Sequence, residues 1–259
     1  MTPCRLSILM PAMADRNWVS LADKLHTQAA ACKGVEFLLD VDSGKVTSGI
    51  KRQRLAESAR GDYIAFVDDD DDVSDDYAAS LLSRLTYKPD VVTFDLEQTT
   101  NGVPKNTQSF GLSHTEGTRT SDGMQLMQAN HLCAWRRDLA LSVAWDPRLG
   151  YADDQIWYRP LLGSIETAKE SHIPRVLYRY DFQATGTANQ TSPRVALSRA
   201  LYRGGAKCWR LDDGEIVIAT LGTSVLRGCK LAPVRDRHNV VRVMSTAELG
   251  NPFVTANIV

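Results

Sequence analysis

Five consecutive aspartates, Asp68–Asp72, directly follow the apolar run Tyr63–Val67. An apolar run rich in β-branched and aromatic residues predicts a buried strand of a parallel sheet. The carboxylates would then lie at the C-terminal edge of the sheet, where open α/β folds bind their ligands. Carboxylates this close together repel one another, and a divalent cation held by oxygen ligands would offset that repulsion. The run therefore predicts a metal or phosphate site.

A simpler interpretation is a solvated acidic loop that leads into a helix. Ser74 could cap a helix beginning at Asp75, whose positive end would favour Asp75 and Asp76. This accounts for Asp75 and Asp76. It does not account for Asp68–Asp70, which precede the cap.

Two further acidic pairs stand at predicted element ends. Asp40 and Asp42 follow the apolar run Val35–Leu39, and Asp153 and Asp154 begin a segment of helical character. Because parallel strands end at a common edge, the first pair should lie near Asp68–Asp70. One carboxylate could bind base or ribose hydroxyls while others hold Mg²⁺ or Mn²⁺ on a diphosphate. For the second pair, an ordinary helix start is the alternative.

Strand and helix signals alternate along the first hundred residues, which predicts right-handed βαβ units and a parallel sheet. Pro11 is expected to end the first strand, and Gly61 to end the second helix in the C′ position. The expected strands are 6–10, 35–39, 63–67 and 91–94, and the expected helices are about 17–32, 50–60 and 75–86.

The rest of the chain is less regular. A long loop or irregular hairpin is expected over 97–122, and a flexible loop over 184–193. The expected helices are 123–130, 136–143, 153–162 and 195–203, and the expected strands are 172–180, 215–218 and 240–243.

Composition is that of a soluble globular protein, with 259 residues, 43% hydrophobic and 24% charged. No apolar run approaches the roughly 20 residues that span a bilayer, and the N-terminus is typical of a strand rather than a signal peptide. The five cysteines are widely spaced without a C-x-x-C pair, which argues against a zinc site or disulfide framework. We therefore expect a protein of the reducing cytoplasm.

Charge is unevenly distributed. Residues 192–245 hold ten Lys or Arg and four Asp or Glu, although the whole chain has a net charge of -1. A basic segment on an acidic body indicates an anionic partner. An ordinary charged surface is the alternative.

The block Thr47–Asp71 resembles the core of GT-A glycosyltransferases of family 2, which show a K-R turn, an A-x-G-D-Y-I segment and a strand ending in D-x-D. The opening run Leu6–Pro11 resembles their first strand. The resemblance implies a GT-A fold, with a Rossmann-like nucleotide-binding half and a mostly parallel central sheet. It implies a nucleotide-sugar-binding half at 1–100, an acceptor-binding catalytic half at 101–190 and a basic extension at 191–259.

The resemblance also implies roles for particular residues. Asp68 and Asp70 would hold Mn²⁺ or Mg²⁺, although Asp69 and Asp71 allow a register shifted by one. The donor would contact residues on all three strand ends and on the turn before the second helix: Pro11, Asp40, Asp42, Lys51, Arg52, Asp68 and Asp69. A solvated basic turn is the alternative for Lys51 and Arg52.

This chain departs from the family pattern at two places. Gln53 stands where the family has asparagine, and Asp40–Gly44 replaces the commoner D-D-G-S. Both departures weaken the prediction of the nucleobase contacts more than that of the metal site.

The segment Gly150–Asp154 resembles the family's G-x-E-D motif, with Asp154 where the catalytic base stands and Asp153 where a residue that positions acceptor or base stands. Three tryptophans, Trp135, Trp145 and Trp157, are expected in the core or at the surface rather than on a ligand. A metal-ligand role for His172 is a weak prediction.

Together these features imply metal-dependent, inverting transfer from a nucleotide sugar, with a UDP-sugar favoured, to an acceptor hydroxyl. The acceptor would be a glycan or lipid-linked saccharide, or a modified base in DNA bound through the basic segment. Such an enzyme would work in the cytoplasm or peripherally at a membrane.

Other classes are weaker. Asp69–Val73 fits the D-x-D-x-V pattern of haloacid-dehalogenase-like phosphohydrolases, but that motif belongs on the first strand of its fold. An EF-hand loop beginning at Asp68 would have Val73 in place of its glycine and Ala79 in place of its glutamate. A noncatalytic nucleotide-sugar-binding protein stays open.

Overall fold

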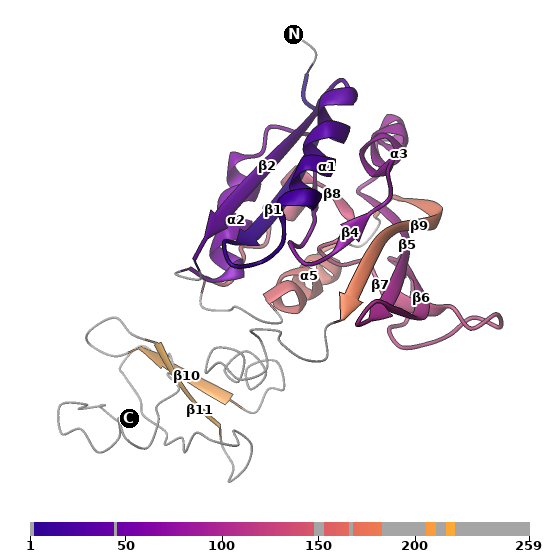
Figure 1. Cartoon of the computed structure of the whole chain (residues 1–259). Coiled ribbons are helices and arrows are strands. Elements are labelled where there is room, and N and C mark those ends of the chain that lie inside the picture. The colour runs from indigo at the N-terminus through magenta and orange to yellow at the C-terminus, as the bar shows by residue number, and fades with distance from the viewer. Residues whose placement is uncertain are drawn as a thin grey trace, which may run out of the picture. The chain divides into compact units, whose positions relative to one another are not determined.

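The computed structural model of the chain describes residues 3–43, 46–147, 153–165 and 168–182, and the backbone of 206–210 and 216–220 (Figure 1). The chain divides into two compact units, Met1–Pro147 with Asp154–Thr185, and Arg148–Asp153 with Gly186–Val259. The first unit holds a mixed nine-stranded sheet. No helix in the described part of the chain is long and apolar enough to span a membrane.

The second unit shows one antiparallel strand pair, β10 (Ala206–Arg210) and β11 (Ile216–Thr220). It confirms the strand expected at 215–218. The helix expected at 195–203, the strand expected at 240–243 and most of the basic segment lie outside the described residues. The division into halves at 1–100 and 101–190 stays a prediction.

The N-terminal elements form the expected parallel βαβ units. The strands β1 (Leu6–Met13), β2 (Val35–Asp42) and β3 (Tyr63–Phe66) lie in the order β2-β1-β3, connected by α1 (Val19–Ala31) and α2 (Ser48–Ser58). Nearly all of β1 and β3 is buried, as expected for strands covered on both faces. The predicted α/β fold with a mostly parallel central sheet is confirmed.

Pro11 does not end the first strand, as the sequence predicted, because β1 continues through it to Met13. The odd-numbered residues of β1 direct their backbone polar groups toward β3, as the bond from Val67 N to Leu9 O shows. Pairing with β3 stops at Leu9. The missing N–H of Pro11 therefore removes no ladder hydrogen bond.

Beyond β3 the sheet becomes mixed. The short strand β8 (Ala134–Arg136) lies antiparallel between β3 and β5 (Val91–Thr100). A hairpin joins β5 to β6 (Val103–Gly111), in agreement with one of the two expectations for 97–122. The helix expected at 123–130 is wrong. Its residues form β7 (Gln125–Gln128), which pairs with β6, and this tertiary pairing overrides a weak helix preference.

The helix after the aspartate run begins later than expected. The strand β4 (Asp72–Val73) pairs with β9 (Glu170–Phe182), and Ser74 N donates to Leu177 O. These bonds hold the backbone extended, so α3 (Tyr77–Arg84) begins at Tyr77 and the predicted Ser74 cap is wrong. The short helix η1 (Leu85–Tyr87) follows, and α1 and α3 pack side by side (Figure 1).

Two further helices lie near the expected positions. The helix α4 (Arg137–Ala140) is shorter than the one expected at 136–143. The helix α5 (Asp153–Gly163) matches the one expected at 153–162, and β9 contains the strand expected at 172–180.

Gly61 has a different role from the one predicted. The helix α2 ends at Ser58, and Gly61 is not among the glycines with positive φ in the described residues. A Cβ at Gly61 would lie 2.6 Å from Ser7 N and 2.8 Å from Leu6 C. Glycine is needed here because the chain passes directly over the β1 backbone.

Gly61→Ala is therefore expected to lower the free energy of unfolding by about 1–3 kcal/mol, because the added methyl must displace backbone in a packed core. Urea denaturation measures this. Gly163→Ala is the matched control, since a Cβ there meets nothing within 4 Å. Equal stability of the Gly61→Ala protein and the wild type would contradict the close approach.

Candidate functional site

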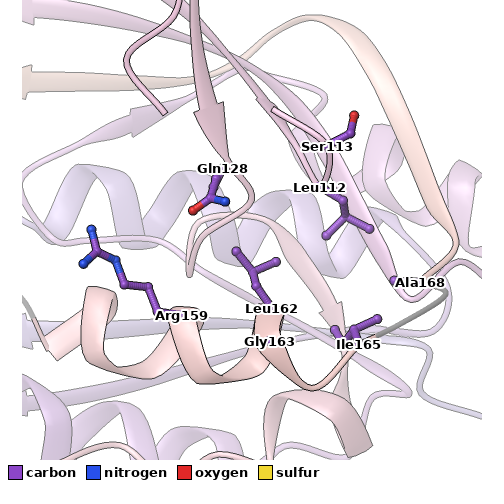
Figure 2. Close-up of a pocket in the computed structure, with 8 residues that line it drawn as sticks. All are labelled: Leu112, Ser113, Gln128, Arg159, Leu162, Gly163, Ile165 and Ala168. Carbon is purple, nitrogen blue, oxygen red and sulfur yellow. The ribbon is translucent and has the colours of Figure 1, made fainter. Parts of the chain in front are cut away.

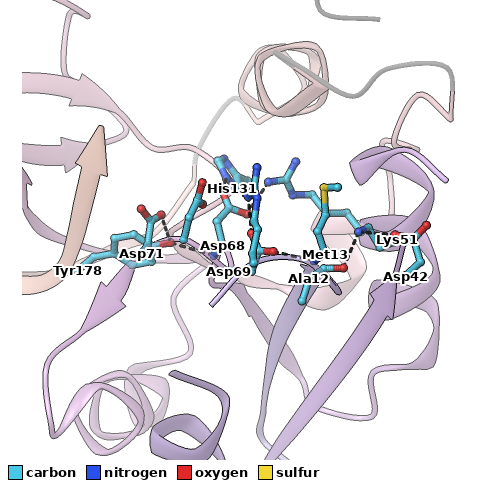
Figure 3. Close-up of polar contacts among 12 residues, drawn as sticks. Ala12, Met13, Asp42, Lys51, Asp68, Asp69, Asp71, His131 and Tyr178 are labelled. Carbon is cyan, nitrogen blue, oxygen red and sulfur yellow. Dashed lines mark hydrogen bonds and ion pairs between the residues drawn. The ribbon is translucent and has the colours of Figure 1, made fainter. Parts of the chain in front are cut away.

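The three parallel strands end at one edge, as the sequence predicted (Figure 3). The β1–β2 register places Asp40 beside Pro11 and Asp42 beside Met13. The loop after β3 reaches the same level, because Met13 N donates to Asp69 Oδ2 at 2.7 Å. Asp40, Asp42 and Asp68–Asp71 are thus gathered at the carboxyl edge of the sheet.

Asp69 ties the end of β1 to the aspartate run. Its side chain is 4% exposed, and its Oδ1 lies 2.5 Å from Arg16 Nη1. The same guanidinium nitrogen lies 3.0 Å from Asp70 Oδ2. Arg16 is a site residue that the sequence reasoning missed, since it stands in an irregular loop with no motif around it.

Lys51 and Arg52 are buried, so the alternative of a solvated basic turn is wrong. Thr47 caps α2 by accepting from Ile50 N, which fixes where the first turn begins. From that turn, Lys51 Nζ donates to Ala12 O at 2.7 Å and to Asp42 Oδ1 at 2.8 Å. Arg52 Nη2 donates to Asp68 Oδ1 at 2.5 Å. Their contact with a donor stays a prediction.

A stack of planar groups holds Arg52 in place. Its guanidinium carbon lies 5.1 Å from the centroid of the Trp145 ring, a cation–π arrangement. Trp145 stacks on Trp157 with centroids 4.8 Å apart, and both rings are buried, as is Trp135. Of the two places expected for the tryptophans, core or surface, the structure shows the core. Gln53 belongs to the same support, because its Oε1 accepts from Trp145 N at 3.0 Å.

Asp68 contacts side chains from three other segments of the chain. Besides Arg52, His131 Nε2 lies 3.3 Å from its Oδ2, and its backbone N–H donates to Tyr178 Oη at 3.0 Å. Burial opposes ionisation, but Arg52 and His131 outweigh it and hold the pKa of Asp68 well below its usual range. Asp68 is therefore a stable anion.

For Asp70 and Asp71 the pKa is shifted in the opposite direction, upward. Burial, followed by the charges of Asp68 and Asp70, raises the pKa of Asp71 well above its usual range. Burial also raises the pKa of Asp70, with Arg16 opposing and Asp68 and Asp69 adding to the rise. This edge therefore holds more negative charge than its basic side chains neutralise.

Asp71→Asn is accordingly expected to stabilise the ligand-free protein. Tyr178 Oη donates to Asp71 Oδ2 at 2.6 Å, and an amide oxygen can accept the same bond. Because the folded-state pKa is raised, the ionised form destabilises the fold above the unfolded pKa of about 3.9. The higher stability of Asp71→Asn relative to the wild type should therefore be present at neutral pH and vanish below about pH 4.

Differential scanning fluorimetry at several pH values tests the Asp71 prediction. Each kcal/mol gained by removing this buried charge should raise the melting temperature by about 2–4 °C. A lower melting temperature at pH 7 than that of the wild type would contradict the destabilising role assigned to the Asp71 charge.

The helix α5 brings the second acidic pair to the aspartate run. Asp154 Oδ2 lies 3.5 Å from His131 Nδ1, while His131 Nε2 faces Asp68. Asp153, the first residue of α5, is buried. The sequence reasoning missed His131 because the β7–β8 loop resembles no motif.

His172 lies apart from this edge. It lies on β9, where its Nδ1 is 3.0 Å from Thr93 Oγ1 and its Nε2 is 3.4 Å from Asp95 Oδ1, both on β5. It therefore contacts none of the candidate metal ligands in the structure.

An open surface pocket of about 550 Å³, named the α5 cavity, lies beside the second half of α5 (Figure 2). Arg159 lies at its rim, 3.6 Å from Glu116. Its lining is mostly apolar, with a few polar side chains: Leu112, Ser113, Gln128, Arg159, Leu162, Gly163, Ile165 and Ala168. One helix therefore carries Asp154 at its start and lines this cavity near its end.

No protein-family model matches the chain, and a search of curated protein sequences finds no match. Solved structures do resemble it. S. aureus TarS, a glycosyltransferase, matches with a TM-score of 0.52 and 14% identity over 68% of this chain and 36% of TarS.

Residues 1–349 of TarS in complex with UDP-GlcNAc match with a TM-score of 0.52 and 13% identity, over 76% of this chain and 65% of that chain. The chain thus spans less than two thirds of the length of either TarS structure. At this identity the likeness shows the fold alone, a mixed α/β fold with a mostly parallel central sheet that the chain shares with TarS.

Proposed function

We propose that the protein is a metal-dependent glycosyltransferase that moves a sugar from a nucleotide-sugar donor to an acceptor hydroxyl with inversion. The observation that carries the proposal is the gathering of two acidic motifs distant in the sequence. His131 lies between Asp68, at the end of β3, and Asp154, at the start of α5. The glycosyltransferase fold of the chain supports the assignment.

The donor would bind at the carboxyl edge of β1, β2 and β3. The structure of TarS with UDP-GlcNAc supports a UDP-sugar as the donor. Asp40 is the partly exposed carboxylate at the end of β2, with Arg54 Nη1 3.9 Å away, and it is available for base or ribose hydroxyls. Pro11, which lies beside Asp40 in the sheet, and Asp42 would contact the donor next to it. Lys51 Nζ holds the Asp42 carboxylate by a hydrogen bond.

Asp68 and Asp70 would hold Mn²⁺ or Mg²⁺. The pKa values of Asp70 and Asp71 are raised first by burial and then by neighbouring carboxylates, whose negative charge a divalent cation would offset. Among the described residues, no group of three or more His, Cys, Asp or Glu is arranged to hold a metal alone. This suits Mg²⁺-type sites, where one or two carboxylates and the substrate phosphates share the ion. The bound ion would neutralise charge on the departing diphosphate.

Asp154 would act as the general base. It takes the proton of the acceptor hydroxyl while that oxygen forms a bond to the anomeric carbon. The bond from that carbon to the diphosphate oxygen breaks on the opposite face, so the configuration inverts and the nucleoside diphosphate leaves with the bonding electrons. Asp153 would position the acceptor or the base.

The acceptor would be a glycan or lipid-linked saccharide. The α5 cavity, an open pocket lined by both apolar and polar side chains, leaves room for an acceptor on this side (Figure 2). A DNA acceptor bound through residues 192–245 stays a prediction, since most of that segment lies outside the described residues.

A donor screen tests the proposal. The protein with Mn²⁺ is incubated with UDP-, GDP- and TDP-sugars, and release of the nucleoside diphosphate is measured with and without EDTA. EDTA-sensitive release from at least one donor is expected. Donor binding without any turnover would favour the noncatalytic alternative, and absence of both would refute the proposal.

A further inference from the structure

We propose that His131 is a positioning residue that fixes the proposed base, Asp154, relative to the proposed metal ligand, Asp68. The inference rests on the proposed function and deepens it. The sequence pattern assigns nothing to His131, whereas the structure places its two ring nitrogens against carboxylates from two distant elements. Nε2 lies 3.3 Å from Asp68 Oδ2, and Nδ1 lies 3.5 Å from Asp154 Oδ2.

The ring cannot move freely between its two partners. His131 is 7% exposed and packs edge-on against Trp145, with ring centroids 6.3 Å apart. Trp145 is itself stacked on Trp157 and covered by Arg52. The orientation of the imidazole is therefore set by the same stack that aims Arg52 at Asp68.

The backbone that carries the ring is fixed as well. Asn130 O accepts from Trp135 Nε1 at 2.7 Å and from Cys133 N at 3.2 Å. Asn130 Oδ1 accepts from Leu132 N at 3.0 Å. Asn130 thus accepts three hydrogen bonds within the turn that carries His131, and these bonds fix the backbone of the turn.

The place of His131 between these two carboxylates has a consequence for transfer. The base must lie near the anomeric carbon while the diphosphate lies near Asp68, and small errors in such distances are costly. His131 sets the spacing between the two carboxylates before any substrate binds. Groups that orient catalytic or ligating residues commonly contribute about 10- to 100-fold.

Two substitutions separate the two contacts. An asparagine amide occupies the place of Nδ1, so His131→Asn keeps the Asp154 contact and loses the one to Asp68. A glutamine amide reaches the place of Nε2, so His131→Gln keeps the Asp68 contact and loses the one to Asp154. His131→Phe fills the site and loses both.

The experiment measures kcat, donor KM and melting temperature for these variants with the donor that the wild type uses. His131→Gln should keep donor KM within about threefold and lower kcat by about 10- to 100-fold. His131→Asn should show the reverse, and His131→Phe should show both losses. His26→Gln, on the exposed face of α1, should match the wild type.

The outcomes distinguish the two proposals. An active wild type with kcat unchanged in His131→Phe overturns the positioning role alone. Equal losses in the asparagine and glutamine variants that follow their melting temperatures also overturn it, because they indicate a purely structural role. A wild type inactive with every nucleotide sugar overturns the proposed function, and the positioning role with it.

Discussion

Asp154→Asn is expected to lower the rate of sugar transfer by about 10²- to 10⁴-fold, the usual contribution of a general base. Asparagine has nearly the same shape but cannot take the acceptor proton. Donor binding should change little, because the donor would lie on the Asp68–Asp70 side of His131. Steady-state kinetics, with donor binding measured separately by calorimetry, tests both halves of this expectation.

Asp23→Asn is the control for the Asp154 variant, since it makes the same chemical change on the exposed face of α1. It should match the wild type in both rate and binding. Full transfer activity in Asp154→Asn would remove Asp154 from the mechanism, and Asp153→Asn would then be the next variant to measure.

Asp70→Asn is expected to weaken metal-dependent donor binding by at least about tenfold, in line with losses at metal sites. Asp70 is exposed at the edge, and Arg16 is its ion-pair partner. Titrations of the donor at fixed Mn²⁺, and of Mn²⁺ at fixed donor, measure the loss.

The melting temperature of Asp70→Asn shows whether its loss of donor binding results from misfolding. The side chain of Asp70 is 40% exposed. Partial burial and the charges of Asp68 and Asp69 still raise its pKa against the opposing charge of Arg16, so its ionised form does not stabilise the fold at neutral pH. The melting temperature of ligand-free Asp70→Asn should therefore equal or exceed that of the wild type. Unchanged donor affinity in this variant would move the metal site one residue along the run, to Asp69 or Asp71.

Most of the N-terminal framework could be predicted from the sequence because its signals are local. Continuous apolar runs mark β1 and β3, and segments of helical character separate them. The rule that parallel strands end at one edge then brings Asp42 and Asp69 together, as Lys51 and Met13 confirm by their bonds.

The rest depends on contacts between distant segments. The segment Gln125–Gln128 is a strand only because β6 lies beside it, and Asp72 and Val73 are held extended only by β9. Arg16, His131 and Tyr178 reach the aspartate run from the β1–α1 loop, the β7–β8 loop and β9, respectively. No spacing in the sequence relates them to Asp68, so their places required the fold.

Gly61 is a single residue whose role also depends on a contact with a distant segment. The sequence correctly marks a position where the helix has stopped, yet the need for glycine comes from the backbone of Ser7, 54 residues away. Ser7 Oγ also accepts a hydrogen bond from Gly61 N–H. A contact of that kind leaves no local pattern.

The most direct measurement of the central claim is calorimetric titration of UDP, GDP and TDP into the protein with Mn²⁺ and again with EDTA. The account predicts saturable binding of one of these nucleotides, with UDP favoured, that EDTA abolishes and Asp70→Asn weakens. No binding of any of the three at millimolar concentration, with the protein folded, would contradict it.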